Sequence, residues 1–103
     1  MTPSADPSMH GETFSVAASH PALPGHFPQA PVVPGVVMLD RVIAAIERAW
    51  ALRVTGLPQV KFLHPLLPDQ HARLTLSDRG QRVHFQIVHA TATIASGQVE
   101  VAR

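Results

Sequence analysis

An apolar segment that directly follows a proline-rich stretch constrains this chain more than any other feature. Apolar side chains recur at three- and four-residue steps over residues 36–50, which predicts a helix with a wide apolar surface. Residues 20–35 hold five of the ten prolines, so they cannot form a helix or the interior of a sheet. Pro34 and Gly35 mark the expected helix start, where the N–H groups have no helical partner. We expect other structure to wrap most of this helix.

Alternation of apolar and polar residues predicts strands on both sides of the helix. One strand is expected within residues 11–19, and four more follow the helix at 52–62, 71–78, 81–89 and 93–102. The sequence Asp78-Arg79-Gly80-Gln81 predicts a hairpin turn. The join near residues 90–92 is weakly marked, so one long bent strand is an alternative there. The order of elements predicts an α+β domain with an antiparallel sheet packed on a single helix.

The size and composition of the chain fit one small domain. We expect a flexible leader at residues 1–9 and a single domain at 10–103, and a hydrophobic fraction of 46% argues against disorder. A chain this short gains stability when a second subunit covers an apolar face, which makes a homodimer or higher homo-oligomer plausible.

Charge and residue usage exclude several classes of protein. A formal net charge of +1 without a basic cluster argues against nucleic acid as a partner. No apolar run approaches the ~20 residues of a membrane span, and the first residues do not resemble an export signal. The chain contains no cysteine, which excludes disulfides, thiolate metal sites and a cysteine nucleophile. We therefore expect a cytoplasmic protein without a membrane partner.

The residues that could carry chemistry lie in the segment 25–40, GHFPQAPVVPGVVMLD. His26 belongs to the proline-rich loop, Gly35 opens the helix, and Asp40 lies on that helix fourteen positions beyond the histidine. An imidazole can remove a proton near neutral pH, and a carboxyl group in apolar surroundings can be held protonated. The N–H of Gly35 could bind a carbonyl oxygen as it becomes enolate-like. This set supplies the base, the acid and the hydrogen-bond donor that thioester chemistry needs.

Each of these three residues also has a purely structural interpretation. His26 could bond the backbone of its own loop, Gly35 could simply start the helix, and Asp40 could be a structural acceptor. For Asp40 the functional interpretation is favoured, because a carboxylate buried on an apolar helix is costly unless it is bonded or neutralised.

Ordered motifs cover roughly residues 12–102. The most specific is Gly25-His26-Phe27-Pro28 followed by Pro31-Val32-Val33-Pro34-Gly35-Val36 and Leu39-Asp40. The segments 61–69, KFLHPLLPD, and 94–99, IASGQV, add to it. Together these motifs resemble the hot-dog-fold 3-hydroxyacyl-[acyl-carrier-protein] dehydratases of fatty acid synthesis. The pattern Pro-Gly-Val-Val-x-Leu-Asp is also similar to the small accessory dehydratases of aryl-polyene pathways.

The resemblance implies a hot-dog fold, in which an antiparallel sheet wraps around one long central helix and two copies join their sheets. It also implies active sites at the subunit interface. His26 would be the base at C2, Asp40 of the other chain would assist loss of the C3 hydroxyl as water, and the Gly35 N–H would bind the thioester carbonyl. Further substrate contacts would come from Phe27, Pro34 and Val36. The family needs no metal or redox cofactor, and its substrate is a thioester of acyl carrier protein or coenzyme A.

Two positions depart from the family pattern. Asp40 stands where the best-known bacterial members carry Glu, although another branch carries Asp, and the shorter side chain changes its reach. The Pro68-Asp69 turn lacks an intervening glycine. Two other functions stay open: a hot-dog thioesterase, against which the Gly-His-Phe-Pro loop argues, and a non-catalytic acyl-binding or partner subunit.

The remaining histidines and cations are expected to be structural or solvated. The histidine pairs lack helical i,i+4 spacing and cysteine partners, so we predict no metal site. Of the histidines outside the loop, His64 is the strongest candidate for a role because it adjoins the turn. Four cations either meet the acidic surface of a carrier protein or lie on a solvated face: Arg53, Lys61, Arg73 and Arg82.

Overall fold

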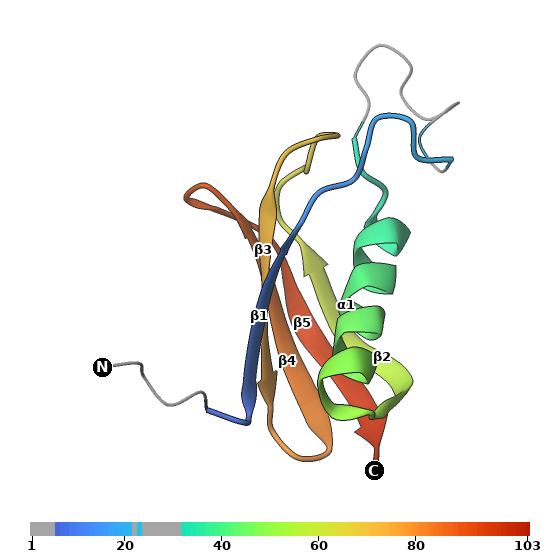
Figure 1. Ribbon diagram of the computed structural model, residues 1–103, viewed down its shortest axis with the longest axis vertical. Helices are drawn as coiled ribbons and strands as arrows, with labels where there is room; N and C mark the ends of the chain where they lie inside the picture. Colours follow the sequence, from blue (N-terminus) through green and yellow to red (C-terminus); the bar gives the residue numbers. More distant parts are fainter. Residues whose placement is uncertain (1–5, 22, 24–31) are drawn as a thin grey trace.

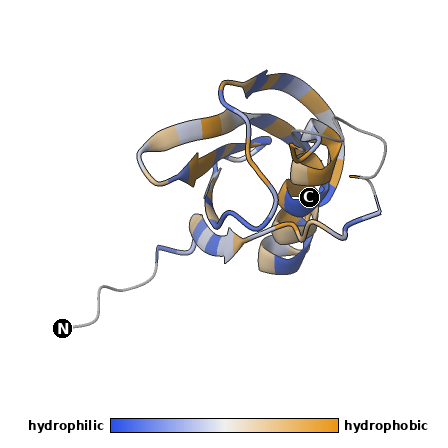
Figure 2. Ribbon diagram, turned by 90° about the horizontal axis from the view of Figure 1, so that it is seen from above, coloured by the Kyte–Doolittle hydropathy of each residue, from blue (hydrophilic) through white to orange (hydrophobic). Residues whose placement is uncertain are grey.

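The computed structural model describes residues 6–21, 23 and 32–103, and these residues form one helix and a five-stranded antiparallel sheet (Figure 1). The elements in chain order are β1 (Met9–Phe14), α1 (Gly35–Trp50), β2 (Arg53–Phe62), β3 (Ala72–Asp78), β4 (Arg82–His89) and β5 (Ala92–Ala102). The strand order is β1-β3-β4-β5-β2, so β1 and β2 are the two edges. The sheet curls around the helix (Figure 2). This arrangement confirms the α+β hot-dog architecture expected from the sequence.

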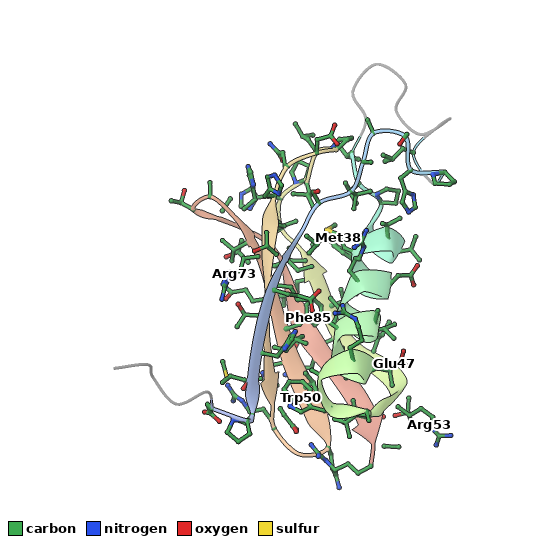
Figure 3. The ribbon with its side chains drawn as sticks, in the orientation of Figure 1. Met38, Glu47, Trp50, Arg53, Arg73 and Phe85 are labelled. Carbon is green, nitrogen blue, oxygen red and sulfur yellow. The ribbon has the colours of Figure 1, made fainter. Side chains whose placement is uncertain are left out.

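One side of α1 packs against the concave face of the sheet. Val42, Ala45 and Ile46 have no exposed surface. Met38 from the helix and Phe85 from β4 lie between the two layers, each 3% exposed (Figure 3). Burial of a side chain of this size contributes about 1.5–3 kcal/mol, so this contact is the main force that holds the helix on the sheet. No helix of the described residues is long and apolar enough to cross a membrane.

The other side of α1 is open in the single chain, so one sheet meets the expectation of a largely wrapped helix on one side only. Val36 is 63% exposed, and Asp40, Ala44 and Glu47 are exposed as well. These four residues follow one another at three- and four-residue steps, so they form one face, which we call the open stripe. The physical reason is that the concave face of a single sheet covers only one side of a helix.

The turns between β3, β4 and β5 differ in how clearly the sequence marks them. The predicted turn at 78–81 is confirmed: Gly80 has a φ of 93°, and the Arg79 N–H donates to the Arg82 carbonyl at 2.8 Å. Between β4 and β5, His89 pairs with Ala92 and Ala90 has a φ of 54°. A tight turn therefore separates two strands, and the alternative of one bent strand is wrong. Alanine rarely adopts a left-handed conformation, so this turn carries no sequence signal.

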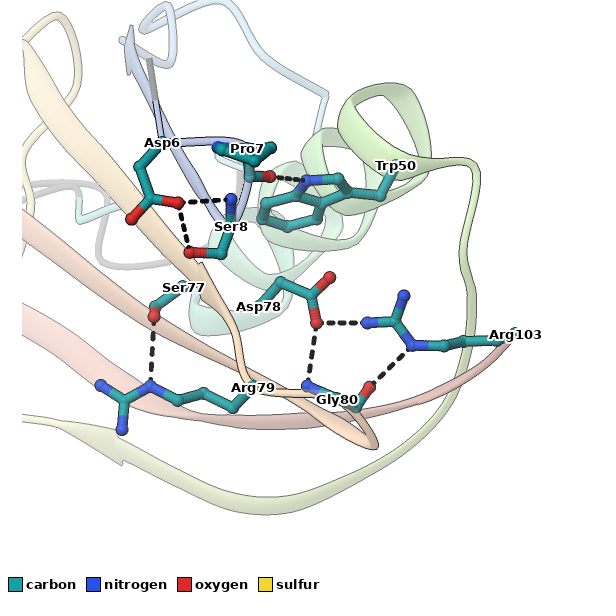
Figure 4. Close-up of polar contacts among 9 residues, drawn as sticks. All are labelled: Asp6, Pro7, Ser8, Trp50, Ser77, Asp78, Arg79, Gly80 and Arg103. Carbon is teal, nitrogen blue, oxygen red and sulfur yellow. Dashed lines mark hydrogen bonds and ion pairs between the residues drawn. The ribbon is translucent and has the colours of Figure 1, made fainter. Parts of the chain in front are cut away.

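The Asp78 carboxylate links the β3–β4 turn to Arg103 (Figure 4). Arg103 donates to Asp78 and to the Gly80 carbonyl, and the Gly80 N–H donates to Asp78 at 3.0 Å. The hydrogen bond from Arg103, followed by that from Gly80, lowers the pKa of Asp78.

β1 begins and ends earlier than the strand predicted within 11–19. It pairs with β3 from Met9 opposite Ser77 to Phe14 opposite Ala72, and pairing stops there because β3 begins at Ala72. Residues 6–9 fall inside the expected leader, yet Met9 belongs to β1 and the Pro7 carbonyl accepts a hydrogen bond from the Trp50 indole at 2.8 Å (Figure 4). Residues 1–5 lie outside the described residues, and the division into a leader and one domain stays a prediction.

Three polar side chains, His10, Glu12 and Arg48, tie β1 to the last turn of α1. The Glu12 carboxylate accepts hydrogen bonds from His10 at 2.9 Å and from Arg48 at 3.0 Å. Burial raises the pKa of Glu12, but the hydrogen bonds from Arg48 and His10 outweigh it, and the net pKa is lowered. The Trp50 ring meets His10 edge-on, with ring centroids 6.3 Å apart. These contacts close the end of the core that is remote from the helix start.

β2 is an irregular edge strand. Its pairing with β5 shifts between Val54 and Gly56 and again between Gly56 and Gln59. Pro58 lies in the second irregularity, where it offers no N–H to either neighbour. Within the described part of the chain, the outer edge of β2 pairs with no other strand.

We predict that a valine-to-alanine substitution lowers the stability of the protein more on the covered side of α1 than on the open stripe. Val42→Ala should lower the free energy of unfolding by about 2 kcal/mol, because Val42 is fully buried. Val36→Ala should change it by less than about 0.5 kcal/mol. Urea denaturation of both variants measures the difference, and equal effects would contradict the packing described here.

We also predict a pH-dependent contribution from Glu12. Because its pKa is lowered on folding, the carboxylate stabilises the fold above its unfolded pKa, and this contribution disappears as the pH falls through the folded value. Glu12→Gln should cost about 0.5–1 kcal/mol near about pH 7, and the difference from the wild type should shrink between about pH 5 and pH 3. Denaturation curves across this range test it.

Glu100→Gln is the matched control for Glu12→Gln. Glu100 is exposed and lies 4.0 Å from Arg82, so its loss should change little at any pH. A constant difference between Glu12→Gln and the wild type across the pH range would refute the ion-pair interpretation.

Candidate active site

A cavity of about 360 Å³ lies at the amino end of α1. Its lining comes from the loop before the helix, the first helical turn and the segment after β2: Val32, Val33, Gly35, Met38, Phe62, Leu63, His64 and Pro65. Among the described residues of this lining, His64 is the only one with an ionisable side chain, and most of the others are apolar. A cavity of this size and character suits the acyl part of a small substrate.

Two other hollows do not contain any predicted site residue. One of about 550 Å³ lies beside the β3–β4 turn, and one of about 350 Å³ lies over strands β2, β5 and β4. Both are lined mainly by polar side chains. In the described residues, no group of three or more His, Cys, Asp or Glu side chains could hold a metal ion.

Backbone hydrogen bonds bring the two walls of the cavity together. The Val33 N–H donates to the Leu66 carbonyl at 2.8 Å, which joins the loop before the helix to the segment after β2. The N–H groups of Leu63 and His64 both donate to the Ile94 carbonyl, at 2.8 and 3.3 Å. The segment is thus anchored to the start of β5 as well as to the loop.

Gly35 is the first residue of α1 and lies against the ring of Phe62. A Cβ at this position would lie 2.6 Å from Phe62 Cζ, so only glycine permits this contact without a shift of the ring. The Pro34 carbonyl accepts the N–H groups of Val37 and Met38 at 3.0 and 3.4 Å. No hydrogen bond between described residues uses the N–H of Gly35 or Val36. These two N–H groups lie at the positive end of the helix dipole, and no described residue occupies them.

A backbone hydrogen bond fixes the imidazole of His64. Its Nδ1 lies 2.9 Å from the Thr93 carbonyl oxygen. A carbonyl oxygen only accepts, so Nδ1 carries the proton, and Nε2 of the neutral ring is an acceptor.

The structure brings together only part of the predicted site. Gly35 lines the cavity, and the role predicted for its N–H as a donor to the thioester carbonyl stays a prediction. Pro34 is the N-cap of α1 and is half-buried, whereas Val36 is exposed beside the cavity and does not line it. The catalytic and substrate-contact roles predicted for His26 and Phe27 fall outside the described residues.

Asp40 differs most from expectation. It is exposed on the open stripe and does not line the cavity, and no hydrogen bond joins its carboxylate to a described side chain. The argument that a buried carboxylate must be functional is therefore wrong for the single chain. The sequence periodicity placed Asp40 on a mostly apolar helix but did not reveal which side of that helix the sheet covers.

Sequence analysis missed Met38, Phe62 and the cavity position of His64. Met38 follows Gly35 by three positions, so helical spacing could have placed both on one face. Phe62 and His64 belong to the quoted segment 61–69, but their approach to the helix start depends on how β2 pairs with β5. That pairing is irregular, and no local pattern encodes it.

Comparison with known proteins finds a matching family profile and curated relatives that are named as dehydratases. The profile of the ApeI-like family, described as ApeI dehydratase, matches residues 4–98. The curated relative 3-hydroxyacyl-[acyl-carrier-protein] dehydratase FabZ of Rhodopseudomonas palustris strain TIE-1 is 29% identical over 96 residues, which cover 82% of this chain and 63% of the relative. FabZ of R. palustris strain HaA2 is 30% identical, with 82% and 62% covered. The chain thus spans somewhat less than two thirds of these relatives.

Solved structures share the fold. The dehydratase heterocomplex ApeI:P from Xenorhabdus doucetiae gives a TM-score of 0.85 at 22% identity, covering 98% of this chain and 93% of that one. An uncharacterized protein from Erwinia carotovora subsp. atroseptica gives 0.75 at 24% identity, covering 91% and 82%. Both likenesses confirm the hot-dog architecture. Because the family profile extends over nearly all of the sequence, this chain belongs to the ApeI-like dehydratase family.

Proposed function

We propose that this protein dehydrates a 3-hydroxyacyl thioester to a trans-2-enoyl thioester, with the acyl group carried by an acyl carrier protein or coenzyme A. The observation that carries the proposal is the mostly apolar cavity at the amino end of α1. Gly35 lines this cavity, and its N–H makes no hydrogen bond to a described residue. The matched family and the curated relatives are both named as dehydratases. A cytoplasmic location is part of the same proposal.

In this reaction the base and the acid act on neighbouring carbons. His26 removes a proton from C2, the electron pair forms the C2–C3 double bond, and the C3 hydroxyl leaves as water with a proton from Asp40. The thioester oxygen gains negative charge as the proton leaves, and the Gly35 N–H stabilises that charge at the positive end of α1. Phe27, Pro34 and Val36 contact the acyl thioester. No redox cofactor is required, because the oxidation level of the substrate does not change overall. The proposal uses no metal either, because His26, Asp40 and the Gly35 N–H supply the base, the acid and the donor.

The proposed active unit is a homodimer in which Asp40 of one copy meets His26 of the other. Two observations support this. Asp40 lies on the open stripe and outside the cavity of its own chain, so it is available to a site on a second copy. The outer edge of β2 carries no strand in the part of the chain that the structure describes. The ApeI:P neighbour is a heterocomplex, which makes a chain of different sequence the competing partner.

A crotonyl thioester assay distinguishes the functions that the sequence left open. Loss of enoyl absorbance by hydration supports the dehydratase, because the reaction is reversible. Release of free thiol without hydration would indicate a thioesterase, and neither change would indicate an acyl-binding or partner subunit.

We predict that His26→Ala and Asp40→Asn each lower kcat for crotonyl thioester hydration by about 100-fold or more. When the two variants are mixed and their subunits exchange, about a quarter of the wild-type rate should return. Half of the dimers are then mixed, and each mixed dimer has one intact site. Steady-state rates before and after mixing measure this. If mixing restores nothing while both variants still dimerise, the shared-site arrangement is wrong.

We predict that Gly35→Ala lowers kcat/KM by about tenfold or more, because the added Cβ displaces the Phe62 ring from its present contact. Phe62→Ala removes that clash, so the double variant should be more active than Gly35→Ala alone. Thermal melts of all three proteins check that the fold is kept. Full activity of Gly35→Ala would exclude the Gly35 N–H from the reacting group.

A further inference from the structure

We propose that His64 is a second histidine of the site and that its Nε2 accepts a hydrogen bond from the 3-hydroxyl of the bound acyl chain. The inference rests on the proposed function for the identity of the substrate, but it concerns a residue to which that function assigns no role. Its basis is the lining of the cavity and the fixed orientation of one imidazole.

Among the residues that the structure describes, one hydrogen-bonding side chain lines the cavity, that of His64. The other lining side chains are Val32, Val33, Met38, Phe62, Leu63 and Pro65, and Gly35 has none. The acyl part of a 3-hydroxyacyl thioester is apolar except for its carbonyl and its hydroxyl. A hydroxyl that leaves water for apolar surroundings loses free energy unless it finds an acceptor. Among the described lining residues, His64 is the side chain that can provide that acceptor, and it is itself exposed to solvent.

The orientation of His64 is set before any ligand arrives. The Nδ1 proton is held by the Thr93 carbonyl at 2.9 Å, and the His64 backbone N–H is held by the Ile94 carbonyl at 3.3 Å. Nε2 therefore presents a lone pair rather than a proton when the ring is neutral. An acceptor fixed in this way binds a hydroxyl at a lower entropic cost than a freely rotating side chain does.

His64 and Gly35 would act on opposite ends of the reacting unit. The Gly35 N–H donates to the carbonyl oxygen on C1, and His64 accepts the hydrogen of the hydroxyl on C3. Two contacts of opposite polarity orient the C2–C3 bond on which elimination occurs. Because Nε2 holds the hydroxyl hydrogen, the lone pairs of the hydroxyl oxygen stay open to the acid. His64 is thus a substrate-contact residue that positions the leaving group, while His26 remains the base.

Two substitutions at His64 distinguish the role of Nδ1, which bonds the Thr93 carbonyl, from the role of Nε2, the proposed acceptor. His64→Asn keeps an N–H in the place of Nδ1 and lacks any atom at Nε2, whereas His64→Gln places an amide group near Nε2. His89→Asn is the matched control, because His89 makes the same kind of contact, with Nδ1 2.7 Å from the His71 carbonyl, but does not line the cavity.

The test measures binding rather than turnover. The probes are butanoyl and 3-hydroxybutanoyl pantetheine in which NH replaces the thioester sulfur, since the α-proton of an amide is too weakly acidic to react. Wild type should bind the hydroxylated probe about 3- to 10-fold more tightly than the plain one. His64→Asn should abolish that preference, His64→Gln should keep part of it, and His89→Asn should leave it unchanged. Titration calorimetry gives the four ratios.

The possible outcomes distinguish a failure of this inference from a failure of the proposed function. A full hydroxyl preference in His64→Asn overturns the inference even if the wild type hydrates crotonyl thioester. Equal weakening of both probes also overturns it, because Nε2 would then contact the pantetheine arm. A preference that requires His64 in a protein without hydratase activity supports the inference and contradicts the proposed function. Failure of the wild type to bind either probe contradicts both.

Discussion

The burial of one side of α1 against the concave face of the sheet determines the rest of this structure. Val42, Ala45 and Ile46 are fully excluded from solvent, and they fix both the direction of the helix and its rotation about its own axis. The direction brings the first helical turn to the loop at residues 32–33 and to the segment after β2. The rotation decides that Met38 faces the interior while Asp40 faces outward. The cavity and the open stripe are thus two results of the same contact.

Local patterns predicted the elements well, because each depends on few neighbours in sequence. The helix and the last four strands lie within about a residue of the expected ranges, since side-chain periodicity alone defines them. The turn at Gly80 was visible because glycine readily takes a positive φ, and the turn at Ala90 was not. Asp69 also has a positive φ, of 67°, which aspartate tolerates better than most residues. This accounts for a turn that lacks the glycine of the family pattern.

The site was less predictable, because its walls come from distant parts of the chain. The Gly-His-Phe-Pro and Pro-Gly-Val motifs pointed to Gly35, yet only the hydrogen bonds of Val33 with Leu66 and of Leu63 with Ile94 bring Phe62 and His64 beside it. Helical periodicity also could not tell which side of α1 the sheet would leave uncovered. The exposure of Asp40 is therefore a property of the tertiary structure. In a single chain, Gly35 lines the cavity, whereas Asp40, which is expected to assist loss of the C3 hydroxyl, lies on the open stripe.

The irregular course of β2 bears on self-association of this fold. A straight edge strand offers neighbouring molecules a continuous row of donors and acceptors, and such rows invite uncontrolled sheet growth. In β2, Pro58 supplies no N–H, and the two shifts in pairing on either side of Gly56 bend the strand. A flat strand from an unrelated chain cannot match this outline along its whole length. The bend thus selects for a neighbour of complementary shape and protects the protein against aggregation through this edge.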